Sequence, residues 1–194
     1  MNADKFTQKT IETIQTAQSM AQENGNQYLM PEHLLYALID ADGGLIGTLL
    51  GRMGVDCNAV LSELDTAIDR LPKVSGGSGE VYASPETSKV FNFAEREAKN
   101  SGDAYVSVEH LMLGIFANET ADIKRIFSAH GITKAGFAAE LKKVKTGPVT
   151  SDNPEDTYDA LKKYGTDLVE RAREGKMDPV IGRDQEIRNV IRIL

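Results

Sequence analysis

Tyr28-Leu29-Met30-Pro31-Glu32-His33-Leu34-Leu35 recurs 77 residues later as Tyr105-Val106-Ser107-Val108-Glu109-His110-Leu111-Met112. The alignment extends in both directions without a gap, and it keeps structurally demanding residues such as the glycine pair Gly25 and Gly102. Self-similarity at one fixed offset is the signature of an internal repeat. A duplication therefore organises most of this chain.

The first segment of each repeat carries apolar residues three or four positions apart. These residues are Ile14, Ala17 and Ala21 in the first repeat, and Phe91, Ala94 and Ala98 in the second. This spacing places them on one face of a helix. No strand-like alternation appears in either repeat, so the pattern predicts helices throughout.

Capping residues and glycines suggest four short helices in each repeat. Ser84 before Pro85 is typical of a helix start, because proline suits the first helical position. The expected boundaries are a first helix from near Asp4 or Thr7 toward Gly25, a second from Pro31 or Val108, a third ending at Gly54 or Gly131, and a fourth after Asp56 or Thr133. Helices this short cannot bury their apolar stripes alone. We therefore predict an all-α, pseudo-twofold tandem of two four-helix repeats.

Stretches rich in glycine, serine and proline divide the chain. The expected segments are repeat 1 at 1–72, an inter-repeat linker at 73–82, repeat 2 at 83–145, a flexible linker at 146–157 and the start of another module at 158–194. A last helix is expected from about Arg183, and its apolar stripe of Ile187, Val190, Ile191 and Leu194 has no later partner in this sequence. We therefore expect the sequence to be part of a longer protein.

Composition excludes several classes of function. The net charge is −7, and no stretch gathers Lys and Arg with aromatic residues, which argues against nucleic-acid binding. The first residues lack the pattern of a signal peptide, and nowhere do about 18 apolar residues run together as a membrane span requires. The single cysteine, Cys57, suits a reducing compartment. These features predict a cytoplasmic protein with no membrane partner.

Catalytic and metal chemistry find no support in the sequence. His33 and His110 each lie in the first turn of a duplicated helix, without a second ligand three or four residues away, so no metal site is predicted. No G-x-x-x-x-G-K-[ST] loop occurs, and nothing in this sequence would therefore cradle the phosphates of a nucleotide. We expect no enzymatic activity from this chain by itself.

Two motifs together resemble the Clp family of AAA+ unfoldases. They are the duplicated Pro31-Glu32-His33-Leu34 and Val108-Glu109-His110-Leu111, and the stretch Gly175-Lys176-Met177-Asp178-Pro179-Val180-Ile181-Gly182-Arg183. The resemblance covers essentially the whole chain. The stretch Leu161-Lys162-Lys163-Tyr164-Gly165-Thr166-Asp167-Leu168 is more similar to the disaggregase branch of this family than to its protease-regulating branch.

The resemblance implies the N-terminal region of a homohexameric, ATP-driven machine that threads aggregated client proteins through a central pore and works with the DnaK chaperone system. Residues 158–194 would be the helical start of an α/β AAA+ module in which Val180 and Ile181 contact adenine, with ATP and Mg bound only by the full-length protein. Two alternatives stay open. The chain could be an adaptor- or substrate-binding domain of a Clp protease regulatory subunit, or an architectural piece that caps the hexamer.

Within the family, polar positions linked to client binding match Thr7, Asp103 and Glu109 here. Each has a structural reading as well, because Thr7 is placed to cap a helix, Asp103 follows a glycine in a turn, and Glu109 lies near the positive end of a helix dipole. Both readings remain open for all three residues.

The differences between the repeats give a separate indication. Val90 and Phe93 stand where the first repeat has Thr13 and Thr16, and they form an apolar row beside the row of Phe91. We predict that Val90, Phe91 and Phe93 line a groove for apolar side chains of unfolded clients, with binding in the micromolar range or weaker. The alternative is that the extra row packs against the other repeat.

Overall fold

The computed structural model describes residues 3–74, 80–145, 147–150 and 152. The predicted module at 158–194, including Val180 and Ile181, lies outside the described residues. In the first repeat, a short 3₁₀ turn η1 (Ala3–Lys5) precedes α1 (Gln8–Glu23), β1 (Tyr28–Leu29), α2 (Pro31–Asp40), α3 (Leu45–Arg52) and α4 (Cys57–Asp69). In the second repeat, the order is β2 (Tyr82–Ala83), α5 (Pro85–Ser101), α6 (Val108–Ala117), α7 (Ala121–Ala129) and α8 (Lys134–Val144). The all-α, four-plus-four prediction is confirmed.

The helices begin where the capping residues predict. Thr7 and Ser84 cap α1 and α5 by accepting hydrogen bonds from the backbone N–H groups three residues later, and Asp56 and Thr133 cap α4 and α8 in the same manner. Gly102 ends α5 with φ of 74°, a left-handed conformation that residues with a Cβ seldom adopt.

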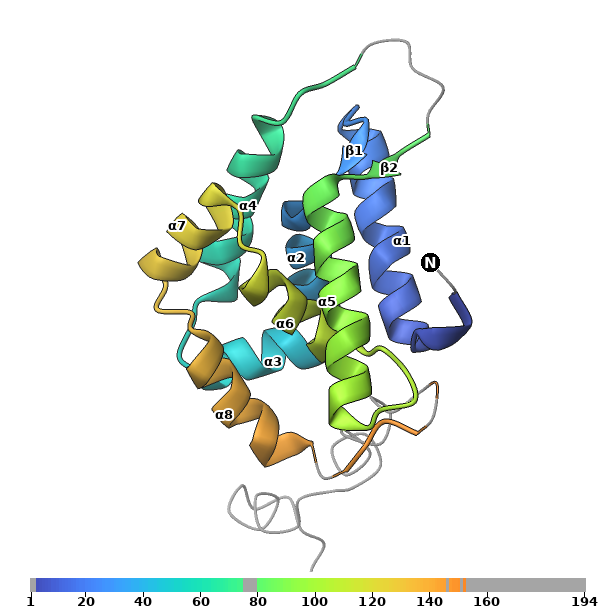
Figure 1. Cartoon of the computed structure of the whole chain (residues 1–194). Coiled ribbons are helices and arrows are strands. Elements are labelled where there is room, and N and C mark those ends of the chain that lie inside the picture. The colour runs from blue at the N-terminus through green and yellow to red at the C-terminus, as the bar shows by residue number, and fades with distance from the viewer. Residues whose placement is uncertain (1–2, 75–79, 146, 151, 153–194) are drawn as a thin grey trace, which may run out of the picture. The chain divides into compact units, whose positions relative to one another are not determined.

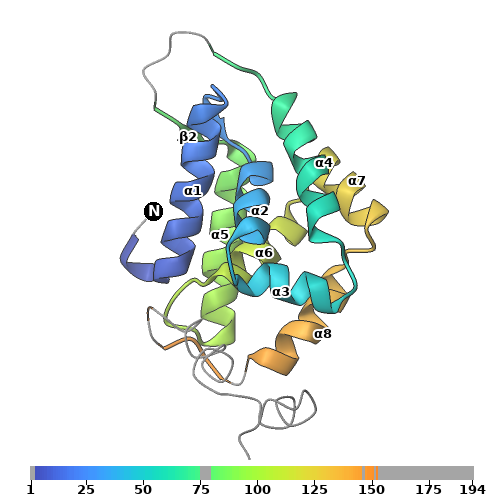
Figure 2. The same cartoon turned by 180° about the vertical axis from the view of Figure 1, so that it is seen from behind.

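The two repeats complete each other's core. Helix α3 packs against α8 and α4 against α7, while α2 and α6 meet between them (Figures 1 and 2). The last two helices of each repeat thus pack against the last two helices of the other. The largest side chains that are fully buried come from both repeats, among them Leu34, Leu49, Leu111 and Phe137. This exchange explains how helices of 8 to 17 residues bury their apolar faces.

Short parallel pairings also cross between the repeats. β1 pairs with β2, with Tyr28 opposite Tyr82 and Leu29 opposite Ala83. The bridge between Phe6 and Val106 is the equivalent pairing with the repeats exchanged. These strands were not predicted, because two residues are too few to show an alternating pattern.

Within the described residues, no single helix is long and apolar enough to cross a membrane. Helices α2 and α3 pass such a test of length and composition only when taken together, and they are bent by 80° relative to each other.

Candidate functional site

A groove runs between α1 and α5, which lie side by side and antiparallel (Figure 1). Its volume is about 680 Å³, and Ile14, Leu29 and Phe91 form its apolar surface. The remaining lining residues are small, polar or charged: Lys5, Gln18, Ala83, Ser88, Asn92 and Glu95. A concave surface with an apolar floor and a polar rim is suited to hold apolar side chains of a partner.

Both repeats contribute equivalent residues to this groove. Ile14 in α1 and Phe91 in α5 occupy the same repeat position, as do Gln18 and Glu95. The other lining residues have no repeat equivalent in the groove, so the groove is built by both repeats without being symmetric.

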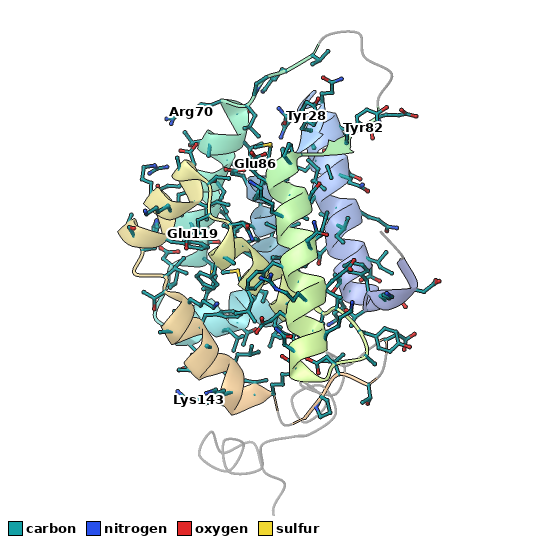
Figure 3. All side chains as sticks on the ribbon, in the orientation of Figure 1. Tyr28, Arg70, Tyr82, Glu86, Glu119 and Lys143 are labelled. Carbon is teal, nitrogen blue, oxygen red and sulfur yellow. The ribbon has the colours of Figure 1, made fainter. Side chains whose placement is uncertain are left out.

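Two exposed tyrosines stand beside one end of the groove. Tyr28 is 49% exposed and Tyr82 is 51% exposed, and they lie opposite each other in the β1–β2 pair (Figure 3). Their neighbours Leu29 and Ala83 line the groove itself. Tyrosine is common at binding surfaces because it combines a large apolar ring with a polar hydroxyl.

The three apolar residues singled out from the sequence point to different places. Phe91 reaches the α1/α5 groove, where it is 8% exposed. Val90 is fully buried and packs within its own repeat, so closely against Gly114 of α6 that a Cβ there would lie 2.6 Å from the Val90 carbonyl oxygen. Phe93 is half-buried, with Arg96 and Lys134 over its ring at 5.0 and 5.6 Å from the centroid. Only Phe91 lines the groove between α1 and α5.

Sequence reasoning did not single out Ile14 and Leu29 as binding residues. The prediction depended on Val90 and Phe93, at which the repeats differ, whereas Ile14 and Phe91 occupy corresponding positions of the two repeats. The duplicated apolar positions Ile14 and Phe91 were the available signal, but helical periodicity alone does not separate a groove floor from a core face.

Asp103 lies at the centre of a buried polar cluster at the end of α5. Its carboxylate accepts hydrogen bonds from Lys145 Nζ at 2.6 Å and from the Val149 backbone N–H at 2.5 Å, and it lies 2.9 Å from His110 Nε2. Burial would raise the pKa of Asp103, but the bonds from Lys145 and Val149 outweigh burial and hold this pKa below its ordinary value. Asp103 is therefore ionised, and Lys145, Val149 and His110 hold its carboxylate in place.

The tautomer of His110 follows from its contacts. The Ser107 backbone N–H donates to Nδ1 at 3.0 Å, so the proton of the neutral ring is on Nε2, which faces Asp103. Burial lowers the pKa of His110, although Glu109 and Asp103 act in the opposite direction. We therefore assign His110 as a neutral donor that orients the Asp103 carboxylate.

Glu109 contacts Lys145, and Thr7 caps a helix. Both carboxylate oxygens of Glu109 are buried without a hydrogen bond, and Lys145 Nζ lies 3.3 Å from one of them as an ion pair. Thr7 caps α1, and its backbone N–H donates to the Val106 carbonyl oxygen at 3.0 Å. Lys145 links Glu109 to Asp103, whereas Thr7 belongs to the inter-repeat bridge. None of the three lines the α1/α5 groove.

Part of the predicted 146–157 linker contacts the helical domain. Val149 is 1% exposed, and its carbonyl oxygen accepts a hydrogen bond from the Ala104 backbone N–H at 2.8 Å. The backbone N–H of Gln8 donates to the Asp152 carbonyl oxygen at 2.9 Å. The polar composition of this stretch gave no reason to expect these contacts.

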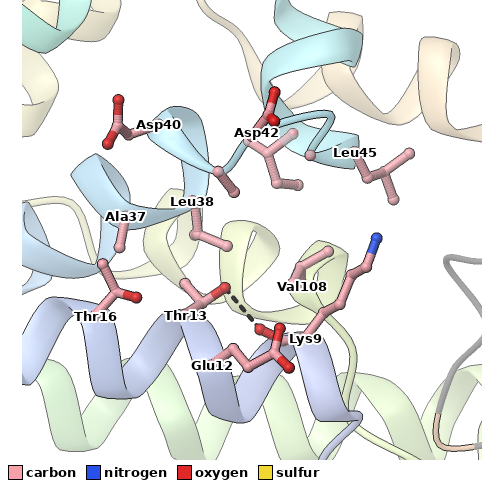
Figure 4. Close-up of a pocket in the computed structure, with 13 residues that line it drawn as sticks. Lys9, Glu12, Thr13, Thr16, Ala37, Leu38, Asp40, Asp42, Leu45 and Val108 are labelled. Atoms are coloured by element: carbon pink, nitrogen blue, oxygen red, sulfur yellow. Dashed lines mark hydrogen bonds between the residues drawn. The ribbon is translucent and has the colours of Figure 1, made fainter.

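Another pocket, of about 260 Å³ and smaller than the groove, lies in the first repeat, where α1 meets the end of α2 (Figure 4). Thr13 borders it, and the Thr13 hydroxyl donates to the Lys9 carbonyl oxygen at 2.8 Å. The rim carries the acidic residues Glu12, Asp40 and Asp42. Among the described residues, no three His, Cys, Asp or Glu side chains are grouped so that they could hold a metal ion.

The chain is similar in sequence to a known domain family and to longer chaperone proteins. Residues 5–130 match the family described as Clp repeat (R) N-terminal domain. The chain is 43% identical over 195 residues to the chaperone protein ClpB of Brucella suis and 40% identical over 196 residues to that of Rhodopseudomonas palustris. Each match covers 100% of this chain but only 22% of the relative, so the chain spans about a fifth of the length of these relatives.

Solved structures share the fold at lower sequence identity. The Hsp104 N-terminal domain from Candida albicans aligns with a TM-score of 0.68 at 21% identity, covering 76% of this chain and 97% of that one. The N-terminal domain of ClpD, a caseinolytic protease associated chaperone from Arabidopsis thaliana, aligns with a TM-score of 0.56 at 23% identity, covering 73% and 99%. At these identities the likeness concerns the fold alone.

Proposed function

Because the chain belongs to the Clp repeat N-terminal domain family, we propose that it binds exposed apolar segments of unfolded or aggregated proteins in the α1/α5 groove. The observation that carries this proposal is the groove's floor of Ile14, Leu29 and Phe91 beneath a polar rim. A folded client keeps such side chains in its core, whereas an unfolded client exposes them. The groove thus distinguishes unfolded from folded proteins by their exposed apolar side chains and not by a particular sequence.

Weak binding suits this role. Burial of two or three side chains gives only a few kcal/mol before the cost of association, so we expect dissociation constants in the micromolar range or above. A client held in this manner can be released when another part of the machine pulls it.

We place this activity within an ATP-dependent protein disaggregase. The relatives that match the chain along its whole length at 40 and 43% identity are chaperone proteins named ClpB. A homohexameric assembly, ATP and Mg in an AAA+ module and cooperation with the DnaK system belong to this proposal. These names favour the disaggregase branch over an adaptor-binding domain of a protease regulatory subunit.

The polar residues that family resemblance linked to client binding have an indirect role in this proposal. Asp103, Glu109 and Thr7 fix the end of α5 and the start of α1, the two helices that form the groove. Substitutions at these positions would then reduce client binding by displacing the helices. The accompanying loss of stability would separate this effect from loss of a direct contact.

A pair of substitutions on one helix tests the groove. Phe91→Ala removes the largest side chain of the floor, and Phe93→Ala removes an equal side chain two residues away that faces Arg96 and Lys134 instead. We expect Phe91→Ala to weaken binding of a permanently unfolded fluorescent protein about tenfold, because the groove loses the largest apolar side chain of its floor. Phe93→Ala should bind as the wild type does. Loss of affinity in Phe93→Ala alone would move the client site to the opposite side of α5.

A further inference from the structure

We propose that the site where Val149 docks is a further binding site for client chains. The protein's own chain occupies this site until an extended client segment with a β-branched apolar residue takes its place. We call residues 147–150 and 152 the docked segment. The site is built by Gln8, Asp103 and Ala104, which do not line the α1/α5 groove, so the proposal goes beyond the proposed function.

The docked segment is held in the manner of a bound peptide. It passes the end of α5 and reaches the start of α1 (Figure 1). The Val149 N–H donates to the Asp103 carboxylate at 2.5 Å, and the Val149 carbonyl oxygen accepts from the Ala104 N–H at 2.8 Å. The Asp152 carbonyl oxygen accepts from the Gln8 N–H at 2.9 Å. Every group that the segment offers in these bonds belongs to the main chain, so any chain that has not spent its backbone groups on structure of its own could make them.

A single side chain gives the site its selectivity. Val149 is 1% exposed, whereas its neighbours Pro148 and Thr150 are exposed. A carboxylate in place of the Val149 side chain would be buried next to the ionised Asp103, and burial of such a charge without a partner is costly. Valine and isoleucine are mostly buried in folded proteins, so a chain that presents them in an extended form is an unfolded one.

The first repeat shows that the repeated fold does not require a buried side chain here. Its returning chain is held at the equivalent place, where Asn26 Nδ2 donates to the Pro72 carbonyl oxygen at 3.1 Å and the Val74 N–H donates to the Gly25 carbonyl oxygen at 2.8 Å. Pro72 is equivalent to Val149 by the repeat offset, yet it is exposed. The slot for an apolar side chain is therefore a feature of the second repeat alone.

The docked segment has few contacts to lose when it is replaced. A cavity of about 580 Å³ adjoins it, and Gly147 and Pro148 form part of the lining together with Leu113 and Leu141. The segment thus borders a cavity and is anchored by one buried side chain, and segments with few buried contacts open at low cost in free energy. Because Val149 follows closely after the end of α8, the segment has a high effective concentration at the site, and a client must compete with it.

Amide NMR of the full chain reports on the site through the N–H groups of Ala104 and Gln8, because each signal depends on its hydrogen-bond acceptor. Val149→Asp should undock the segment and move both signals. Thr150→Asp adds the same charge at the neighbouring exposed residue and should leave both signals near their wild-type positions. The probe is a peptide with capped ends that copies residues 147–152, and a second peptide has aspartate in place of its valine.

In Val149→Asp, the valine peptide should return both signals toward their wild-type positions, and the aspartate peptide should not. The valine peptide should bind the wild type and Thr150→Asp at least about tenfold more weakly, because the docked segment competes at an effective concentration in the millimolar range. Equal affinity for the wild type and Val149→Asp would overturn the competition, and signals that the valine peptide leaves unmoved would overturn the site itself. Should the new carboxylate unfold the chain, Val149→Ala gives the same comparison without a charge.

A permanently unfolded protein then tests whether clients use the site. In Val149→Asp it should move the Ala104 N–H signal, and adding Phe91→Ala should leave that response intact, since Phe91 lines the groove and not this site. An Ala104 signal that moves with the valine peptide but not with the unfolded protein would contradict the proposal. Failure of the groove is read separately, as unchanged client affinity in Phe91→Ala.

Discussion

The two repeats hold the chain that follows their fourth helix by hydrogen bonds of opposite direction. Asn26 in the first repeat and Asp103 in the second occupy equivalent positions, and each faces the histidine of the following helix and the chain that returns after the fourth helix. In the first repeat the returning group is the Pro72 carbonyl oxygen, which needs a donor, and Asn26 Nδ2 donates to it at 3.1 Å. In the second repeat the returning group is the Val149 N–H, which needs an acceptor, and the Asp103 carboxylate accepts from it.

The side chain at the equivalent position depends on which backbone group the returning chain presents. Proline has no N–H and presents only its carbonyl oxygen, so the partner of Pro72 must supply a hydrogen-bond donor, which here is the amide of Asn26. A carboxylate at the equivalent place needs a cation when it is buried, and Lys145 provides one where the first repeat has the buried apolar residue Ile68. Three positions therefore vary together between the repeats: Asn26 with Asp103, Pro72 with Val149, and Ile68 with Lys145.

Exchange of the two polar residues should have the largest effect. Asn26→Asp would place a carboxylate oxygen against the Pro72 carbonyl with Ile68 nearby and no cation, and we expect a loss of about 3–5 kcal/mol in the free energy of unfolding. The reverse change, Asp103→Asn, keeps the acceptor for Val149 but loses the charge that Lys145 pairs with, at about 2–3 kcal/mol. Urea denaturation checks both. Equal, small losses would contradict the polarity argument.

Acid should destabilise the protein through protonation of His33 in the first repeat. Burial lowers the pKa of His33 to about 4, from an ordinary value of 6.5. The unfolded chain therefore takes up the proton first, and stability is lost as the pH falls from 6.5 toward 4, by on the order of 3 kcal/mol. His110 faces the Asp103 carboxylate, so its charged form has a partner that His33 lacks.

Comparison of His33→Gln with the wild type isolates the contribution of His33 to this pH dependence. We expect the slope of stability against pH between 6.5 and 4 to be clearly smaller in the variant. Parallel curves of stability against pH for the two proteins would show that protonation of His33 does not destabilise the fold.

The contact between the first two helices of each repeat differs in tightness. Gly114 lets α6 approach Val90 of α5, while the first repeat has Ala37 and Thr13 at these positions, next to the pocket of about 260 Å³. Gly114→Ala should cost about 2 kcal/mol of unfolding free energy, because the new methyl group meets the Val90 carbonyl oxygen and overpacking exceeds the gain in helix propensity. An unchanged or raised thermal midpoint would contradict this interpretation.

The smallest effect is expected from Thr13→Val, which gives the first repeat the residue of the second. The Thr13 hydroxyl donates only within its own helix, to the Lys9 carbonyl oxygen, and that oxygen remains part of the helix without it. The free energy of unfolding should therefore change by less than about 1 kcal/mol. A larger loss in the same denaturation assay would mean that the hydroxyl supports the pocket beyond its own helix.

Much of the fold could be predicted because its determinants are local. Thr7, Asp56, Ser84 and Thr133 cap their helices as expected, since a cap depends on residues within one turn. The β1–β2 pairing and the docking of Val149 could not be predicted, because both join segments far apart in the sequence through a few backbone groups.

The candidate site was predictable only in part. The sequence indicated that apolar residues of the second repeat's first helix take part in a groove, and Phe91 does so. The burial of Val90 depends on Gly114, whose role emerges only when α5 and α6 are in contact. The spacing of apolar residues shows which side of a helix is apolar, but not which neighbour covers it.

Methyl NMR can show whether clients bind in the groove that the two repeats share. An unfolded client would be titrated into protein labelled at Ile and Leu methyl groups, and we predict shifts at Ile14 and Leu29, which line the groove. Leu45 and Ile46 line the smaller pocket and serve as the internal control. Shifts at Leu45 and Ile46, with Ile14 and Leu29 unchanged, would show that the client binds outside the groove.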